Sequence, residues 1–329
     1  MIISERKNNH LRICLETDVQ SDITTGLERY RLINNSLPEK NFSDFSLSTS
    51  VFGKKISAPI MISSMTCGTK EGNEINHLLL SVAEEIQIPF AFGSQRIYLE
   101  SKETTHFENP RLIAPNVPLF ANIGAVQLNY GLSRDDCLKA VNMADADALI
   151  LHLNPLQELI QENGNTNFEG LLLKIEQLCM NFPVPVVIKE VGWGISAENA
   201  GKLLDAGVSM IDVAGAGGTS WAKVEANTIG TEKAKRFASA FYDWGIPTAV
   251  SISEIHDKFP DAKLIASGGI RNGVEAAKSI RLGAEICAVA IPILKSIYKD
   301  GEMGLLTYLQ EFILQLKIAM FTSSGIYRI

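Results

Sequence analysis

The 329-residue chain lacks the features that mark several classes of protein. It has no excess of basic residues, because its formal net charge is −7. A broad nucleic-acid-binding surface needs such an excess, so we expect no nucleic-acid partner. The longest apolar run covers only residues 286–294, whereas a membrane-spanning helix needs about 20 residues. The first ten residues lack the apolar stretch of a signal peptide, so we expect a cytoplasmic protein that spans no membrane.

Cysteines are few, and no two lie close in sequence. There are five of them, at Cys14, Cys67, Cys137, Cys179 and Cys287. The odd count and the wide spacing argue against a disulfide framework and against a zinc knuckle. Such cysteine usage suits a reducing compartment.

Short apolar runs rich in β-branched residues alternate with amphipathic segments from about residue 58 onward. The eight runs cover residues 58–63, 89–92, 118–123, 148–153, 185–190, 209–214, 263–267 and 285–290. Near-continuous apolar runs are typical of strands buried on both faces of a parallel sheet. Eight strand–helix alternations predict a (β/α)8 TIM barrel. An open doubly wound sheet is the alternative, but its GxGxxG fingerprint is absent after the first run.

Three regions fall outside this eightfold pattern, and we expect one domain over residues 1–329. Residues 1–57 form a polar N-terminal extension, with one helix expected near 23–34, and the barrel covers 58–329. Residues 215–246 make an unusually long loop after the sixth strand. In a barrel that loop lies at the C-terminal ends of the strands, where active sites are built. Residues 305–322 are expected to form a closing helix.

Polar residues and glycines follow seven of the eight predicted strands. They occupy residues 63–68, 93–96, 122–124, 152–158, 189–190, 215–221 and 267–271. The C-terminal ends of barrel strands meet at one rim, so we expect these residues to surround a single site.

The segment 267–271, Ser-Gly-Gly-Ile-Arg, is a candidate phosphate site. Glycines directly after a strand let backbone N–H groups approach an anion, and the next helix adds a favourable field. A tight turn that merely needs glycine is the alternative. Lys189 ends a buried strand, where an ammonium needs an anionic partner. That partner is either a ligand or an acid of the protein, such as Glu190.

The segment 152–158 brings His, Asn, Gln and Glu together within seven residues. Pro155 stops the strand there. A carboxylate at 158 suits Mg²⁺, which commonly takes one or two carboxylates plus substrate phosphates. A structural histidine and an acid favoured at a helix N-terminus are the alternatives. The basic cluster at residues 6–10 is either a solvated tail or, with Arg96 and Arg271, part of a diphosphate pocket.

Together these segments resemble the type 2, flavin-dependent isopentenyl-diphosphate isomerases. The matching stretches are RKNNH (6–10), PIMISSMTCG (59–68), FGSQR (92–96), ANIGA (121–125), LHLNPLQE (151–158), KEVGWGIS (189–196), DVAGAGGTSW (212–221) and SGGIRNG (267–273). LHLNPLQE and DVAGAGGTSW are specific, whereas SGGIR also occurs in other flavin barrels.

The resemblance implies conversion of isopentenyl diphosphate to dimethylallyl diphosphate in isoprenoid biosynthesis, assisted by reduced FMN. It also implies a reductant such as NADPH, Mg²⁺ and a homo-oligomer, a tetramer or octamer. FMN would contact Ser64, Met65, Thr66, Ser94, Asn122, Lys189, Thr219, Gly268, Gly269, Arg271, Ala288 and Val289. The diphosphate substrate would contact Arg6, Lys7, His10, Ser94, Arg96, His152, Asn154 and Gln157.

Three roles follow from the same resemblance. Glu158 would bind Mg²⁺ through the diphosphate, Lys189 would favour the anionic form of reduced FMN, and Gln157 would be catalytic, orienting the alkene or relaying a proton. The rim shows no obvious pair of carboxylates to act as acid and base, and reduced FMN would fill that gap. The chain departs from the family pattern at Cys67 and Ala288, where glycine is usual.

Two other functions remain open from the residues. A flavin α-hydroxy-acid oxidoreductase shares SGGIR, but it needs a histidine base and an arginine clamp just before it. Here that stretch offers only His256, on an expected outer helix. A non-catalytic FMN-binding protein would keep the phosphate turn, yet it has no need for LHLNPLQE.

Overall fold

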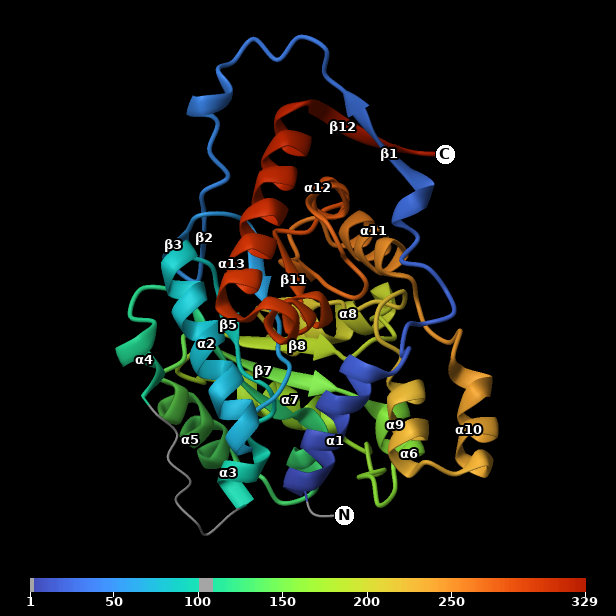
Figure 1. Cartoon of the computed structure of the whole chain (residues 1–329). Helices are drawn as coiled ribbons and strands as arrows, with labels where there is room; N and C mark the ends of the chain where they lie inside the picture. The colour runs from blue at the N-terminus through green and yellow to red at the C-terminus, as the bar shows by residue number, and fades with distance from the viewer. Residues whose placement is uncertain (1–2, 101–108) are drawn as a thin grey trace.

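The computed structural model describes residues 3–100 and 109–329, and its centre is a closed parallel barrel (Figure 1). The barrel strands follow the order β10-β11-β4-β5-β6-β7-β8-β9. Their bounds are β4 Ile60–Ile62, β5 Phe90–Ala91, β6 Leu119–Gly124, β7 Ala148–Leu153, β8 Val186–Glu190, β9 Met210–Asp212, β10 Leu264–Ala266 and β11 Ile286–Val289. Seven of these strands lie within the apolar runs predicted for them. The eighth, β6, extends one residue beyond its run, to Gly124. The predicted TIM barrel is confirmed.

Helices pack around the outside of the barrel. The longer ones are α2 Lys70–Ile86, α5 Arg134–Ala144, α7 Leu171–Cys179, α8 Ala197–Asp205, α11 Thr248–Lys258, α12 Gly273–Arg281 and α13 Ile291–Phe321; the shorter ones are α3 Arg96–Glu100, α4 Pro110–Ile113 and α6 Pro155–Ile160. Local signals set their starts: α5 opens with a capping box in which Ser133 and Asp136 exchange hydrogen bonds. The expected closing helix forms the second half of α13, which has non-helical dihedral angles at Asp300 and Gly301.

A hairpin closes the N-terminal end of the barrel. Strands β2 (Thr49–Val51) and β3 (Lys54–Ile56) pair antiparallel. Val51 and Ile56 pack among inward-facing barrel residues, and the ring centroid of Phe52 lies 5.7 Å from that of Phe120. The hairpin therefore plugs the barrel with apolar side chains.

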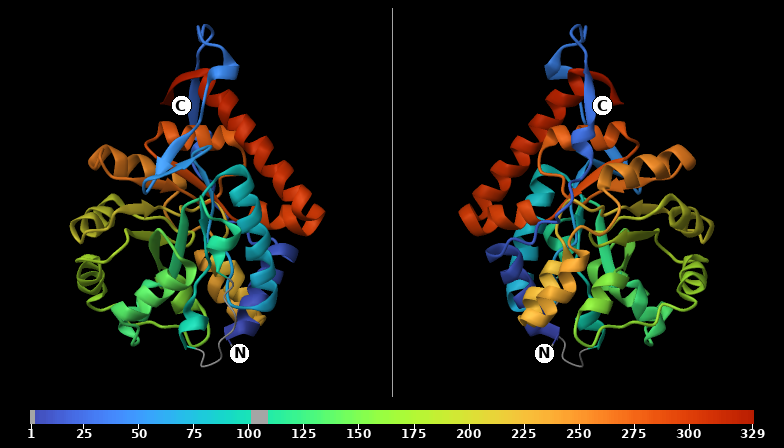
Figure 2. Two further views of the ribbon diagram at one scale, coloured as in Figure 1. Left: turned by 90° about the vertical axis from the view of Figure 1, so that its left-hand side faces the viewer. Right: turned by 90° about the vertical axis from the view of Figure 1, so that its right-hand side faces the viewer.

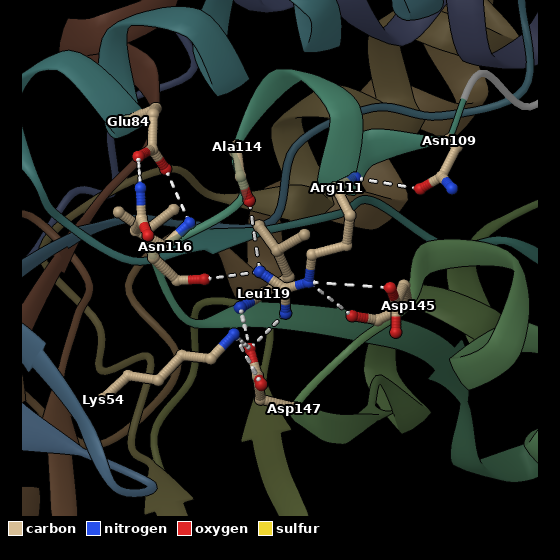
Figure 3. A network of polar contacts seen from close by, with 10 residues as sticks. Lys54, Glu84, Asn109, Arg111, Ala114, Asn116, Leu119, Asp145 and Asp147 are labelled. Carbon is tan, nitrogen blue, oxygen red and sulfur yellow. Dashed lines mark hydrogen bonds and ion pairs between the residues drawn. The ribbon is translucent and has the colours of Figure 1, made fainter.

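A network of charges fastens this plug (Figure 3). Asp147, just before β7, accepts a hydrogen bond from Lys54 Nζ at 3.0 Å and from Arg111 Nη2 at 2.5 Å. The backbone N–H of Leu119 also donates to this carboxylate, at 2.8 Å. Arg111 donates further to the carbonyl of Val117 at 2.7 Å. Every charge at the centre of this network has a partner of opposite sign.

The N-terminal extension differs from the sequence-based expectation. The prediction of a helix near residues 23–34 is wrong. The structure has a single 3-10 turn, Leu27–Arg29, that leads into strand β1 (Tyr30–Asn34). Strand β1 pairs antiparallel with β12 (Ser323–Arg328) at the other end of the chain. That partner is too distant in sequence for a local pattern to reveal. The residues before it include a helix, α1 (Ile3–Glu16), that the sequence analysis did not expect.

The β1–β12 ribbon and helix α1 lie at opposite extremities of the molecule in both views of Figure 2. Helix α1 packs against α9 (Trp221–Ile229), which belongs to the long segment after β9. That segment also contains α10 (Glu232–Ala238) and the turn Ser239–Phe241. In the described part of the chain no helix is both long and apolar enough to cross a membrane. The five cysteines are free thiols.

Candidate functional site

A cavity of about 270 Å³ opens at the C-terminal ends of the barrel strands. Its walls come from the loops after the strands, from α1 and from the start of α13. Every residue predicted for the site lines it: Arg6, Lys7, His10, Ser64, Met65, Thr66, Ser94, Arg96, Asn122, His152, Asn154, Gln157, Glu158, Lys189, Thr219, Gly268, Gly269, Arg271, Ala288 and Val289. The fold thus brings together side chains from nearly the whole length of the chain.

The turn after β10 lies very close to the backbone of the loop after β9. Gly268 and Gly269 have φ angles of 95° and 78°, in the left-handed region that favours glycine. A Cβ at Gly268 would lie 2.0 Å from the carbonyl oxygen of Gly215, and one at Gly269 would lie 2.2 Å from that of Gly217. The turn therefore packs directly onto the loop after β9, and only glycine fits at both positions.

Arg271 follows this turn and is held by the N-terminal extension. Its Nη2 donates to Gln20 Oε1 at 2.9 Å, and Gln20 Nε2 donates to the carbonyl of Gly217 at 2.6 Å. One glutamine thus connects the arginine to the loop after β9. The guanidinium is fixed at the edge of the cavity beside the glycine turn.

Lys189 forms a salt bridge with a carboxylate that the sequence analysis did not single out. Its Nζ lies 3.4 Å from Oδ2 of Asp212, which is buried at the end of the neighbouring strand β9. Of the two expectations for its partner, the acid of the protein is present, and it is not Glu190. The Glu190 carboxylate accepts the backbone N–H groups of Val191, Gly192 and Trp193. Burial raises the pKa of Glu190 to about 7.

His152 presents a neutral imidazole to the cavity. Burial, followed by the nearby Lys189 and Lys7 ammonium groups, lowers its pKa to about 4. Its Nδ1 lies 2.8 Å from Asn122 Oδ1, and Asn122 Nδ2 donates to Ser64 Oγ at 2.9 Å. This chain of contacts fixes the ring across the ends of three strands, β4, β6 and β7.

Helix α1 places a lysine inside the cavity. Lys7 Nζ donates to the carbonyl oxygens of Cys67 and Ser94, at 2.6 and 2.7 Å. Burial, assisted by the charges of Arg6 and Arg96, lowers its pKa to about 8. Three cations converge here, one of which, Arg96, also pairs with Glu100 at 2.5 Å, so this wall suits a polyanion. The basic cluster at residues 6–10 is therefore not a solvated tail.

Gln157 is held on both sides of its amide. Its Nε2 donates to Glu225 Oε1 at 2.8 Å, and Asn154 Nδ2 donates to its Oε1 at 3.1 Å. Glu225, on α9, is 1% exposed, and His10 Nε2 lies 3.4 Å from its Oε1. Sequence reasoning missed this carboxylate beside Gln157. A single glutamate inside an amphipathic helix gives no signal, since its partners come from α1 and α6.

Glu158, also on α6, is oriented by three donors. Asn154 Nδ2 donates to its Oε1 at 3.0 Å, while the N–H of Asn165 (at 2.6 Å) and the amide of Gln161 donate to its Oε2. Among residues 3–100 and 109–329 no group of three or more His, Cys, Asp or Glu side chains could hold a metal ion. A metal at Glu158 would therefore need oxygen ligands from a substrate and from water, as Mg²⁺ commonly does.

Relatives share this sequence over nearly its whole length. A protein from Nostoc sp. named isopentenyl-diphosphate delta-isomerase is 49% identical over 321 residues, 97% of this chain and 91% of the relative. One with the same name from Rickettsia rickettsii is 45% identical, covering 98% of this chain and 94% of its own. The chain belongs to the isopentenyl-diphosphate delta-isomerase family. A sequence profile described as FMN-dependent dehydrogenase also matches residues 134–327.

Solved structures outside this family share its fold. A mandelate oxidase with (S)-2-phenylpropionate superposes with a TM-score of 0.67 at 16% identity, covering 98% of this chain and 95% of that one. A mutant of an active chimera of (S)-mandelate dehydrogenase has a TM-score of 0.66 at 15% identity, with coverage of 99% and 98%. At such low identity these likenesses show the TIM-barrel fold alone.

The geometry separates the delta-isomerase family from the α-hydroxy-acid alternative. His256, the histidine available before the SGGIR segment, lies on the outer helix α11. A Cβ at Gly283 would lie 2.3 Å from its ring, which places it against the turn after α12 and outside the cavity lining. The histidines that do line the cavity, His10 and His152, come from α1 and β7.

The two departures from the family pattern both lie in the cavity wall. Cys67 is fully buried, and burial raises the pKa of its thiol to about 11. Its carbonyl oxygen is one of the two that hold Lys7. Ala288 belongs to the inner core of the barrel and is 3% exposed.

Proposed function

We propose that this chain interconverts isopentenyl diphosphate and dimethylallyl diphosphate in the cavity at the barrel mouth, with FMN and Mg²⁺ as cofactors. One observation carries the proposal: Gln157, with its buried carboxylate neighbour, opens into the same cavity as the cation at Lys7 and the glycine turn at 268–269. The family membership supplies the substrate, because the relatives bear its name.

The residues present fit FMN. The turn Gly268–Gly269 lines the cavity and carries no side chains, so its backbone N–H groups could approach a phosphate group closely. Lys189 supplies a buried cation for a ring that carries negative charge when reduced. Further contacts would come from Ser64, Met65, Thr66, Ser94, Asn122, Thr219, Arg271, Ala288 and Val289. When bound, reduced FMN supplies acid–base chemistry beside the alkene without net redox change, after reduction by a donor such as NADPH.

The diphosphate would bind at the wall that carries Arg6, Lys7 and Arg96, with His10, Ser94, His152 and Asn154 around it. Cations held by helix α1 and the loops after β4 and β5 meet the anion there. This grip lies away from the reacting carbons, so its binding energy can hold them in position. Glu158 would bind Mg²⁺, completed by diphosphate oxygens and water.

Gln157 would act at the reacting carbons. An unactivated alkene is a poor base, so any proton must be delivered from a fixed position with water excluded. Glu225 and Asn154 hold the Gln157 amide by both of its ends. Gln157 therefore orients the alkene or relays a proton through Nε2 or Oε1, and Glu225 keeps that amide in one rotamer.

The test is to incubate the protein with FMN, a reductant, Mg²⁺ and isopentenyl diphosphate, and to look for dimethylallyl diphosphate by mass spectrometry after chromatography. We expect product only when reduced FMN is present, and a yellow protein before reduction. A yellow protein that forms no product would favour the non-catalytic flavin-binding alternative. Size-exclusion chromatography with light scattering tests the proposed homo-oligomer in the same preparation.

A further inference from the structure

We propose that Asp212 is a positioning residue that offsets the charge of Lys189 and thereby sets the reduction potential of bound FMN. The inference rests on the proposed function, because it requires FMN beside Lys189. It concerns a salt bridge between Lys189, which lines the cavity, and the buried Asp212, which does not.

The barrel register fixes this pair. Lys189 and Asp212 are register partners across β8 and β9, and Asp212 is also the register partner of Ile265 across β9 and β10. Asp212 is 1% exposed. Its Oδ1 accepts from Ser267 Oγ at 2.5 Å and from the N–H of Ala214 at 3.2 Å. With Oδ1 occupied in this way, Oδ2 is directed at Lys189 Nζ, 3.4 Å away.

The other titratable groups around Lys189 do not duplicate this role. Glu190 turns away and accepts three backbone N–H groups of the loop that follows it. Only its carbonyl oxygen accepts from Lys189 Nζ, at 2.9 Å. His152, the register partner of Lys189 on β7, is held neutral by burial, which lowers its pKa to about 4. Asp212 is thus the carboxylate paired with this ammonium.

A buried pair of opposite charges presents less positive potential to its surroundings than the cation alone. Reduction of FMN takes up two electrons and one proton and leaves a monoanion, with the electrons supplied by an added reductant. A full positive charge at Lys189 favours that anion over oxidised FMN. Asp212 weakens the preference, so removing its charge must make bound FMN easier to reduce.

The experiment measures the midpoint potential of bound FMN by reductive titration against a reference dye. In Asp212→Asn we expect a positive shift, equivalent to an increase of about tenfold in the ratio of reduced to oxidised FMN at fixed potential, the scale of one pKa unit. Ser267→Ala keeps the charge and removes one donor from Oδ1. The carboxylate then offsets Lys189 more fully, so the potential shifts negative by a smaller amount.

Asp147→Asn is the matched control, since it removes an ion-paired carboxylate at the opposite end of the barrel (Figure 3). We expect its FMN potential to equal that of the unmodified protein. An unchanged or lower FMN potential in Asp212→Asn overturns the inference. If Asp212→Asn does not fold, a positive shift of the FMN potential in Ser267→Ala overturns it. An unmodified protein that binds no FMN overturns the proposed function and, with it, this inference. Normal FMN binding and isomerisation with no shift in the variants overturns the inference alone.

Discussion

The Asp147 network at the closed end of the barrel and Lys7 at the open end differ in how their charges are balanced, although the open end also holds the Lys189–Asp212 salt bridge. At the closed end, Asp147 lies between Lys54 and Arg111, so each cation meets a carboxylate within the protein (Figure 3). At the open end, two neutral carbonyl oxygens hold Lys7, and Arg6 and Arg96 lie near enough to lower its pKa. Neutral acceptors orient the ammonium without offsetting its charge.

Under the proposed function, this contrast separates residues that stabilise the fold from residues that bind a ligand. Removing one partner of a buried pair leaves the other charge uncompensated and destabilises the protein. Burying a cation among other cations costs free energy that a bound anion recovers. Substitutions at the closed end should therefore change stability, and substitutions at the open end should change binding and turnover.

The largest effect is expected at Gln157. Gln157→Ala should lower turnover at least ~100-fold, the scale associated with a positioned proton-transfer group. Because the cofactor-binding walls are untouched, FMN should still bind. Steady-state kinetics and the visible spectrum of the variant measure the two effects. Turnover close to that of the unmodified protein would remove Gln157 from catalysis.

Lys7→Met should raise the KM for isopentenyl diphosphate by about 30-fold, the equivalent of about 2 kcal/mol for a desolvated charge pair. The melting temperature should stay the same or rise, since the variant no longer buries an ammonium group. Kinetics and thermal unfolding of the same preparation provide the comparison. An unchanged KM together with a large drop in melting temperature would make Lys7 a structural residue.

Asp147→Asn should show the reverse pattern. The loss of the carboxylate that pairs with Lys54 and Arg111 should lower the free energy of unfolding by about 2 kcal/mol, below the range for fully buried pairs because its side chain is partly exposed. The KM and turnover of the folded protein should not change.

Asp145→Asn is the control for this prediction. The Asp145 carboxylate is largely exposed and lies 3.9 Å from Arg111 Nε, so the free energy of unfolding should barely change. Equal losses from both variants, in urea unfolding, would contradict the account.

Glu158→Gln should raise the Mg²⁺ concentration that gives half-maximal activity by about tenfold or more, since one negatively charged ligand is lost. A titration of activity with Mg²⁺ after chelator treatment measures this. The amide oxygen can still accept from Asn154, but the NH2 group cannot accept from Asn165 and Gln161 as Oε2 does. An unchanged metal dependence would place the metal elsewhere.

The smallest effect is on the pH dependence of substrate binding. The pKa of Lys7 in the free protein is lowered to about 8, so its ammonium is present below that pH and is lost as pH rises through it. The KM for the diphosphate should therefore increase severalfold above about pH 8. Lys7→Arg stays charged over this range and should lack the inflection. The same inflection in both proteins would assign it to another group.

The barrel could be predicted from the sequence, because each buried strand is a local apolar run bounded by polar residues. Most rim residues could be predicted as a group for the same reason, since they follow those runs. Arg6, Lys7 and His10 lie outside the runs, and it was the resemblance to the isomerase family that implied that they belong to the site. The strand Tyr30–Asn34 could not, because its partner, Ser323–Arg328, lies at the far end of the chain. Helix Ile3–Glu16 is polar enough to be mistaken for a lead-in segment.

The sequence did not reveal the supporting carboxylates Asp212 and Glu225, for a related reason. Asp212 ends a strand and Glu225 lies inside a helix, and neither position is unusual for an acid. Their significance comes from partners in other elements, Lys189 for the first and Gln157 for the second. Local sequence patterns place a residue at the rim, whereas only the folded chain shows which rim residues touch.

The most direct test of the account is a crystal structure of the protein with FMN, Mg²⁺ and isopentenyl diphosphate. We expect the FMN ring beside Lys189, its phosphate at the Gly268–Gly269 turn, and the substrate diphosphate in contact with Lys7. The alkene carbons would lie between the ring and Gln157. Density for the diphosphate away from Lys7, or for FMN outside this cavity, would contradict it.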